Sequence, residues 1–380
     1  YKLYGIDGDV VPVIRDSNND GVIETADGDF AFILFGMRRG GITYRMLNVT
    51  DKDNPVLVWE RRLNEAGQSW SSPVVTRMDI SDSDQNDMKA VVVLGGGYDG
   101  VHDTATFNPA VDRAGSGIHV LDLLDGTTLW RAGHTSTEAD LKLANMTRSI
   151  PTRIKVVDIN GDGFADRMYT ADLGGQLWRF DISNGNPAAS IVAGGVIARF
   201  GAEGLDVPTA ADTRRFYNSP DVAIFNDVRQ NRRFISVSIG SGYRAHPLDL
   251  SATDRFYSLR DPNVFNSLTQ AQYDALIPFT EADLVDVSGE VDVTITAEDA
   301  GWKLPLPPNE MELADSVTFN DEVFFVSFSP DSDAATACIA GQGTNRLWRM
   351  SIINGDPIVD NIGDIQTGEE DNARRTELAQ

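Results

Sequence analysis

One motif recurs along the chain and limits its possible folds more than any other feature. A strand-like run with a proline near its start occurs at Pro12, Pro73, Pro151 and Pro220. Each run leads into a polar turn, and an apolar run that ends in glycine, such as "KAVVVLGGGYDG", usually follows. Next comes a strand rich in aromatic or β-branched residues, and a fifth unit near the end begins "DSVTFNDEVFFVSFSP". The chain is therefore expected to contain five copies of one supersecondary unit.

The length and content of these units predict the fold class. Successive prolines are roughly 60 to 80 residues apart, and each unit holds three or four short strands with little helix between them. Antiparallel units of this kind are typical of propeller blades. A two-sheet sandwich also has short strands, but it does not explain the recurring order of motifs. We therefore predict an all-β, modified β-propeller, and the abrupt start suggests that a first blade is missing.

Two segments depart from the repeat. Residues 262–313 are expected to form an insertion between blades, and Thr269 followed by Gln272 predicts one short helix in it through a capping box. The tail, 364–380, has no apolar periodicity and is expected to be disordered. The propeller domain is accordingly placed at 1–363.

The third unit contains the acidic loop "VVDINGDGFAD", whose spacing suits a calcium ion. Calcium takes six to eight oxygen ligands, and a loop supplies them best from alternate residues. Position twelve, where an EF-hand has a bidentate acid, is Tyr169, and the sequence after the loop resembles a strand, so the loop is expected in a β-hairpin. The alternative is a carboxylate-rich turn without metal. The predicted ligands are Asp158, Asn160, Asp162, the carbonyl of Phe164, and Asp166.

The same register recurs in the first unit, in "DSNNDGVIE", and predicts a second calcium site. The loop "DISDSDQND" of the second unit has weaker ligands, and a solvated turn is the favoured interpretation there. The metal loops thus occupy one recurrent place, between the proline strand and the apolar strand. The ligands predicted for the second site are Asp16, Asn18, Asp20, the carbonyl of Val22, and Glu24, with Asp27 at position twelve.

Charge and composition exclude several classes of protein. The chain has 57 acidic and 32 basic residues, a formal net charge of −25, which repels nucleic acid and anionic lipid. It has no run of eighteen apolar residues, so no membrane insertion is expected. Its four histidines are scattered, and the glycine motifs "GGGYDG" and "GSGYRA" precede no helix, so a phosphate cradle or an enzyme active site is not predicted. Cys338, the single cysteine, allows no internal disulfide.

The segment "PTRIKVVDINGDGFADRMYTADLGGQLWRFDISNG" closely resembles the calcium-loop blade of the PilY family of type IV pilus tip-associated adhesins and biogenesis factors. Other pieces fit in order, among them "SIGSGYRAHPLDLSATDRFYSLRD" and "GWKLPLP". The resemblance implies the C-terminal propeller of a large exported protein, located outside the cell at the pilus tip or at the outer membrane. It also implies action with minor pilins, a role in pilus extension, surface adhesion and twitching motility, and regulation by Ca²⁺ bound at 158–166.

The sequence also departs from the family pattern. It contains no Arg-Gly-Asp triplet to support integrin binding, and the loop that starts at Asp16 is an additional site. The sequence is also compatible with two other functions. One is a quinoprotein-type propeller enzyme, which needs quinone ligands and a catalytic acid on the propeller axis. The other is an integrin-like calcium adhesion propeller that is unrelated to pili. The surface ligand is not predicted.

Overall fold

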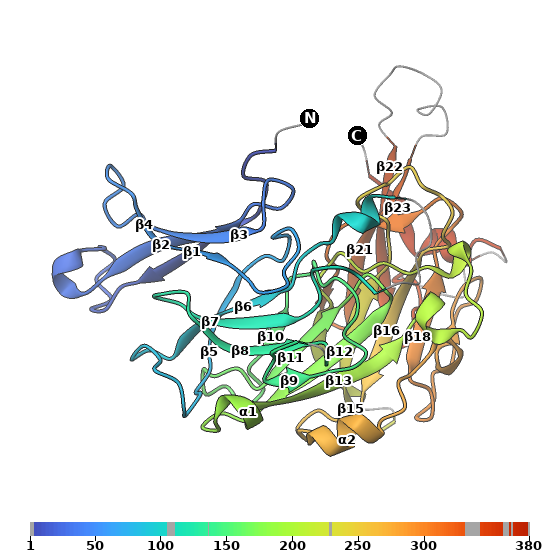
Figure 1. Cartoon of the computed structure of the whole chain (residues 1–380). Coiled ribbons are helices and arrows are strands. Elements are labelled where there is room, and N and C mark those ends of the chain that lie inside the picture. The colour runs from blue at the N-terminus through green and yellow to red at the C-terminus, as the bar shows by residue number, and fades with distance from the viewer. Residues whose placement is uncertain are drawn as a thin grey trace.

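The computed structural model describes residues 4–104, 111–135, 137–227, 230–330, 343–359, 365 and 368–378, so Cys338 lies outside the described residues. Within them, strands form five largely antiparallel sheets that follow one another along the chain (Figure 1). The first two sheets contain β1 (Val10–Arg15), β2 (Phe30–Gly36), β3 (Thr43–Asn48) and β4 (Val56–Arg62), then β5 (Val74–Arg77), β6 (Ala90–Gly95), β7 (Ile118–Asp122), β8 (Thr128–Gly133) and β9 (Leu141–Lys142).

The other three sheets continue in the same order. The third contains β10 (Lys155–Val157), β11 (Arg167–Ala171), β12 (Gln176–Ile182) and β13 (Val192–Arg199). The fourth contains β14 (Asp221–Asp227), β15 (Arg232–Gly240), β16 (Arg255–Asp261), β18 (Gly301–Pro305) and β17 (Val285–Asp286). The fifth contains β19 (Met311–Glu312), β20 (Val317–Phe319), β21 (Glu322–Ser329), β22 (Thr344–Ser351) and β23 (Arg375–Glu377).

Helices are few and short in the described residues, and none is long and apolar enough to cross a membrane. The α-helices are α1 (Ala188–Ile191), α2 (Gln270–Ala275) and α3 (Glu370–Ala373). The 3₁₀ turns are η1 (Thr25–Asp27), η2 (Gly100–Asp103), η3 (Gly201–Gly204), η4 (Ala210–Asp212) and η5 (Glu281–Asp283).

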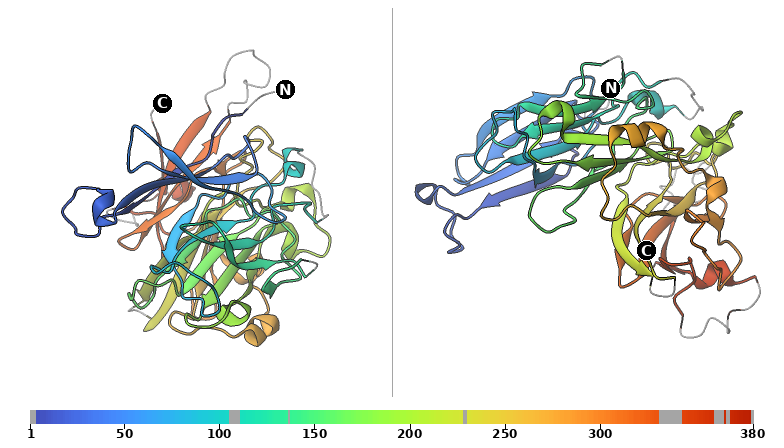
Figure 2. Two further views of the ribbon diagram at one scale, coloured as in Figure 1. Left: turned by 60° about the vertical axis from the view of Figure 1, so that its left-hand side comes forward. Right: turned by 90° about the horizontal axis from the view of Figure 1, so that it is seen from below.

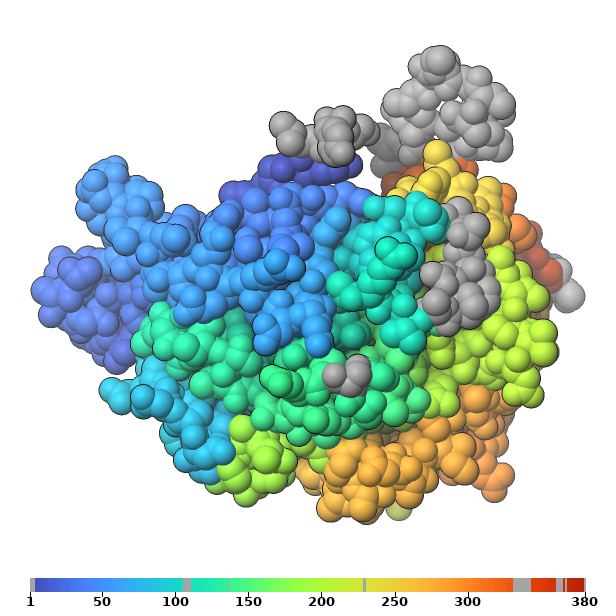
Figure 3. Space-filling model, in the orientation of Figure 1, coloured from blue at the N-terminus to red at the C-terminus, as the bar shows by residue number. Residues whose placement is uncertain are grey.

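Each of the first four sheets starts at one of the repeated prolines. Pro12 lies in β1, Pro73 directly precedes β5, Pro151 lies shortly before β10, and Pro220 directly precedes β14. Neighbouring units in the sequence are neighbours in space, as the colours of Figure 3 show, and the first sheet reaches outward from the others (Figure 2). The predicted fold class, an all-β modified β-propeller, is confirmed.

Hydrophobic cores lie between consecutive sheets, because alternate residues of one strand face opposite neighbours. In β6, the side chains of Val92 and Leu94 join the core shared with the first sheet. Those of Val91 and Val93 join the core shared with the third sheet. A strand that is buried on both faces must be apolar at successive positions, which explains the run "AVVVL". The recurring tryptophans are also buried by this packing: Trp130, Trp178 and Trp348 are at most 1% exposed.

The glycine motifs allow close backbone contact between neighbouring units. Gly97 has a φ of +99°, and a Cβ atom there would lie 2.2 Å from the Gln68 carbonyl oxygen. The tyrosines of the two motifs, Tyr98 and Tyr243, join Tyr217 in one buried cluster, against which Trp70 packs. These glycines therefore serve inter-blade packing, and aromatic side chains fill the space between the units.

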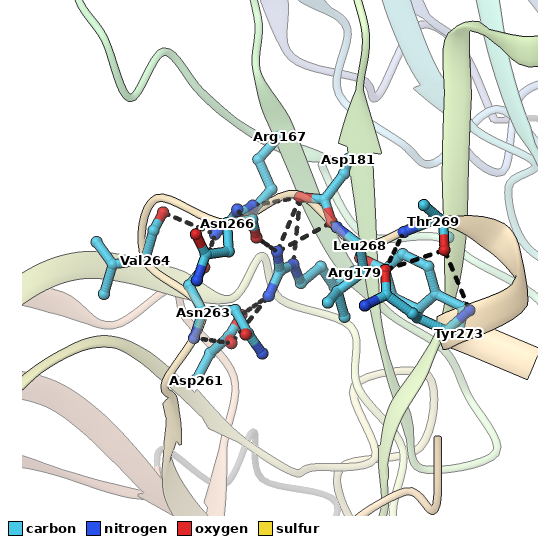
Figure 4. A network of polar contacts seen from close by, with 12 residues as sticks. Arg167, Arg179, Asp181, Asp261, Asn263, Val264, Asn266, Leu268, Thr269 and Tyr273 are labelled. Atoms are coloured by element: carbon cyan, nitrogen blue, oxygen red, sulfur yellow. Dashed lines mark hydrogen bonds and ion pairs between the residues drawn. The ribbon is translucent and has the colours of Figure 1, made fainter. Parts of the chain in front are cut away.

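A buried network of charged side chains joins the third sheet to the end of β16 (Figure 4). Arg179 Nη1 lies 2.8 Å from Asp261 Oδ2, and Arg167 Nε donates to Asp181 Oδ1 at 2.6 Å. Tyr273, on α2, donates its hydroxyl to Asp181 Oδ2 at 2.8 Å. The two arginines also donate to the main-chain carbonyl of Asn266. The two positive charges of the arginines balance the two negative charges of the aspartates. Because both arginines also donate to Asn266, the network holds the start of the inserted segment against the third sheet.

The predicted insertion is partly confirmed and partly wrong. The helix α2 begins after Thr269, which forms the expected capping box with Gln272. However, β18 lies inside the predicted range 262–313 and pairs with β16 as a regular strand of the fourth sheet. The inserted part is therefore within the fourth blade and ends before Gly301. Trp302 and Leu304 are both fully buried, so β18 has the alternating pattern of a blade strand. It lacks the repeated proline that marks the start of a unit, which is why the sequence predicted it as part of the insertion.

The tail, 364–380, is not wholly disordered as predicted. Within its described part, β23 pairs antiparallel with β22 at the edge of the fifth sheet. The Arg374 side chain is fully buried, and its Nε donates to the Gly355 carbonyl at 2.8 Å. Main-chain pairing and one buried arginine hold this segment in place. Neither requires a periodic pattern of apolar residues, so the sequence shows no sign of this order.

The buried network gives a stability prediction. Changing Arg179 to Met leaves Asp181 and Asp261 buried with less compensating charge, so we expect a loss of about 3–5 kcal/mol in the free energy of unfolding. Urea denaturation measures this loss. The control is Arg349→Met, which breaks a half-exposed pair with Glu322 and should cost less than about 1 kcal/mol. Equal effects of the two changes would show that the network does not hold the two sheets together.

Candidate metal centre

The loop 158–166 connects two neighbouring strands of the third sheet. Asp158 directly follows β10, and Asp166 directly precedes β11. The Asp158 carboxylate winds the loop, because Oδ1 accepts from the Gly161 amide at 2.7 Å and Oδ2 from the Gly163 amide at 2.8 Å. Both glycines have positive φ, +78° and +86°. The residues between the strands thus form a tight turn around one carboxylate, which a side chain at either glycine would strain.

Asp166 closes this loop and brings the predicted ligands together. Its Oδ2 accepts from the Ile159 amide at 2.7 Å and from the Asn160 amide at 3.2 Å. The Asn160 side chain lies between two carboxylates, with Nδ2 donating to Asp162 Oδ2 at 3.1 Å and to Asp166 Oδ1 at 3.4 Å. A donor group thus occupies the position where carboxylate oxygens converge, and a cation would be favoured at the same position.

The donor set of this loop fits a hard cation. It consists of oxygens from Asp158, Asp162, Asp166, the Asn160 amide and the Phe164 carbonyl, which is the chemistry that calcium prefers. Among the described residues, no three histidine, cysteine, aspartate or glutamate side chains stand as a preassembled metal cluster. Binding would therefore require the Asn160 amide to turn its oxygen inward and the carboxylates to close.

The loop 158–166 is also tied to the neighbouring blade. The guanidinium carbon of Arg77, at the end of β5, lies 4.2 Å from the centre of the Phe164 ring. The Ala165 amide donates to the Arg77 carbonyl at 2.9 Å. The conformation of this loop is thus coupled to the packing of the second sheet against the third.

The loop of the first unit, here called the first loop, starts at Asp16, joins β1 to β2 and repeats this hydrogen-bond pattern. The Asp16 carboxylate accepts from the amides of Asn19 at 2.7 Å and Gly21 at 2.9 Å. Asp20 Oδ1 accepts from the Val22 amide at 2.8 Å, and Asn18 Nδ2 donates to Asp20 Oδ2 at 3.0 Å. Positions one, three and five of the two loops therefore have the same geometry, as their shared register predicts.

The residues that close the first loop differ from the predicted ones. The Glu24 side chain is exposed, and among the described residues it makes no hydrogen bond. Asp29, which directly precedes β2, accepts from the Ser17 amide at 2.7 Å and from the Glu24 amide at 3.2 Å. Asp27 accepts from Asn18 Nδ2 at 3.0 Å. Asp29 thus takes the place of Asp166 at the amide that follows position one, and Asp27 takes its place at the position-three asparagine side chain.

Counting nine positions from Asp16 could not identify Asp29, because this loop is five residues longer than 158–166. The signal in the sequence is instead an aspartate directly before the second strand, as at Asp166. Asp29 is 4% exposed. Hydrogen bonds from the Ser17 and Glu24 amides lower its pKa below the usual 3.8.

In the second unit, "DISDSDQND" forms a turn whose acids have other partners. Asp79 pairs with Lys89 at 2.6 Å, and Asp82 Oδ1 accepts from the Ala188 amide of α1 at 2.8 Å. The absence of metal from this turn stays a prediction.

Five blade-like sheets with side chains packed between them define a propeller-type domain, and comparison with known proteins gives its relatives. No protein-family model matches the chain. The type IV pilus biogenesis factor PilY1 of Pseudomonas aeruginosa strain PAO1 is 30% identical over 180 residues, and PilY1 of strain UCBPP-PA14 is 29% identical over 178 residues. Each match covers 46% of this chain and 13% of the relative, so the matched region is a small part of PilY1.

A solved structure shows the same fold. The crystal structure of the P. aeruginosa PilY1 C-terminal domain superposes on 92% of this chain and 71% of that chain, with a TM-score of 0.62 and 19% identity. The chain is thus a relative of PilY1 with the fold of its C-terminal domain, and the resemblance predicted from the sequence is confirmed.

The different roles of Asp29 and Glu24 can be tested by amide hydrogen exchange. Asp29→Ala removes the acceptor of the Ser17 amide, so exchange at Ser17 and Glu24 should become faster. Glu24→Ala is the matched control and should leave the Ser17 amide unchanged. Because the pKa of Asp29 is lowered, its stabilising effect is present above pH 3.8 and is lost as the pH falls through the lowered pKa. Faster exchange at Ser17 in Glu24→Ala would contradict the assignment.

Proposed function

We propose that this chain is a calcium-binding adhesion and assembly module of the type IV pilus machinery. In this proposal it acts with minor pilins at the pilus tip, outside the cell, and supports pilus extension, surface attachment and twitching motility. Its relationship to PilY1, a type IV pilus biogenesis factor, supports the pilus role. Its negative charge and β-sheet architecture fit a binding module.

The observation that best supports calcium binding is the repetition of one loop geometry in two blades. Both loops use an aspartate directly after the first strand, an asparagine at position three and an aspartate at position five. Both also close with an aspartate directly before the second strand. Two loops of different length that reach the same arrangement point to a shared requirement, and an ion held by their oxygens would meet it.

In this mechanism, bound calcium supplies positive charge that offsets repulsion among the carboxylates. Asp158 and Asp166 set the loop shape through backbone amides. The Asn160 nitrogen donates to the carboxylates, and its oxygen would be a ligand of the ion. Since Phe164 and Ala165 contact Arg77, the loop conformation bears on the junction of the second and third blades. An ion can shift such an equilibrium only by its different affinity for the two loop states.

The proposal includes no catalytic role. Trp70, Tyr98, Tyr217 and Tyr243 pack together between the units. His102 is buried and lies 2.7 Å from Asp112. These contacts give the aromatic side chains and the histidine packing roles, and they lend no support to a quinoprotein-type enzyme.

Calcium binding can be tested by stoichiometry and stability together. Isothermal titration should give two ions for the native chain, one for Asp162→Ala, and none for Asp162→Ala combined with Asp20→Ala. Calcium at a hundred times its Kd should add about 2.7 kcal/mol to the free energy of unfolding for each independent site. The matched control is Asp53→Ala, in an exposed loop outside both sites. A melting temperature of the native chain that chelator does not change would contradict both sites.

The pilus role can be tested in cells that make the full-length protein. We expect Asp162→Ala and Asp166→Ala to reduce surface pili and twitching, because the calcium-ordered loop would favour one partner-bound form. Asp53→Ala should behave as the native protein. Extracellular calcium is sufficient for a weak site with a Kd on the order of 10⁻⁴ to 10⁻³ M. Normal pili and twitching in a variant that has lost calcium binding would limit the ion to a structural role.

A further inference from the structure

A polar pocket of about 320 Å³ lies where the first strands of several blades begin. Its lining includes residues one or two positions before those strands: Asp9 before β1, Ser72 before β5, Ser219 before β14 and Asp315 before β20. The repeat therefore brings equivalent positions of several units to one place. The volume is within the range of small-ligand sites.

The pocket collects positive charge in a strongly acidic chain. Three arginines line it, Arg38, Arg153 and Arg244. Arg38 pairs with Asp9 at 3.3 Å, and Arg153 pairs with Asp315 at 3.5 Å. Among the described residues, Arg244 forms no ion pair. Its side chain is exposed, and it lies near Arg38 as well as near Asp9 and Asp315.

Several buried polar groups in the lining lack hydrogen-bond partners within the described residues. They include the Asn218 side-chain nitrogen and the Ser219 hydroxyl, and these two residues are only 3% and 4% exposed. The Nε atom of Arg38 is also buried and unpartnered. Buried donors without acceptors are costly and rare. A ligand that brings acceptor oxygens would satisfy them.

We propose that this pocket binds a carboxylate group. Arginine presents a planar fork that matches the two oxygens of a carboxylate. The lining has three arginines against two aspartates, and Arg244 is the arginine that forms no ion pair among the described residues. Asp9 and Asp315 in the same lining would oppose a dianionic phosphate more than a singly charged carboxylate. Trp70, Pro151 and Leu313 provide apolar wall for the carbon atoms attached to it. The carboxylate could belong to a free organic acid or to the end of a polypeptide.

Titration calorimetry with the whole chain tests this proposal and separates the two sources. The probes are butyrate, N-acetyl-alanyl-leucine, the C-terminal amide of the same dipeptide, and inorganic phosphate. Tighter binding of butyrate assigns the pocket to free organic acids, and tighter binding of the dipeptide acid assigns it to polypeptide ends. In both cases the amide should fail to bind, because it lacks the charge.

Arg244→Gln should weaken binding of the preferred acid roughly tenfold or more, since a hydrogen bond to a charged group is lost. Arg62→Gln is the matched control, because Arg62 is an exposed arginine of β4 outside the pocket lining. Both variants should melt as the native chain does. The proposal is overturned by equal binding of acid and amide, by binding of phosphate alone, by no saturable binding at millimolar concentration, or by equal effects of the two variants. Chelator should not alter the result, so failure here is separate from failure of the calcium sites.

Discussion

The rest of the structure depends on one constraint: most of its sheets must bury both faces against neighbouring sheets. A strand in this position is largely apolar, as in "AVVVL", and any charged residue that it contains must find partners inside the interface. The Arg167, Arg179, Asp181 and Asp261 network meets this requirement between the third sheet and the end of β16. The glycines near Tyr98 and Tyr243 meet another part of it, by letting backbones approach closely.

The same packing determines where functional groups can be placed. Side chains within the blades pack in the hydrophobic cores. The turns between strands are outside this packing, so they can carry functional side chains. The turns after the first strands carry the two acidic loops, and the segments before the first strands line the polar pocket. Calcium-dependent order and recognition of a carboxylate would therefore use separate parts of one repeated unit. Because Phe164 contacts Arg77, calcium-dependent order in the loop 158–166 would affect the junction between the second and third blades.

Much of the candidate site was predictable from sequence because its geometry is local. In the loop 158–166, the side chains of the predicted ligands Asp158, Asn160 and Asp162 contact backbone amides two to five residues further on, so position in the chain nearly fixes position in space. The first loop shows the limit of this argument. Its closing residue, Asp29, is thirteen positions after Asp16, and only the pairing of β1 with β2 brings the two together. The turn η1 takes up the additional residues, and Glu24 is left exposed.

The sequence by itself determined the five repeated units, the strands within them, the capped helix α2 and the register of the two acidic loops. These features depend on periodicity, turn residues and short-range hydrogen bonds, all of which are written in neighbouring residues. Only the tertiary structure decided that β18 completes the fourth sheet, that β23 adds to the fifth and that Asp29 closes the first loop. Only the tertiary structure showed that Arg38, Arg153 and Arg244 line one pocket. Those outcomes depend on contacts between residues far apart in the chain, and a single sequence without pairing information does not specify which distant strands and loops meet.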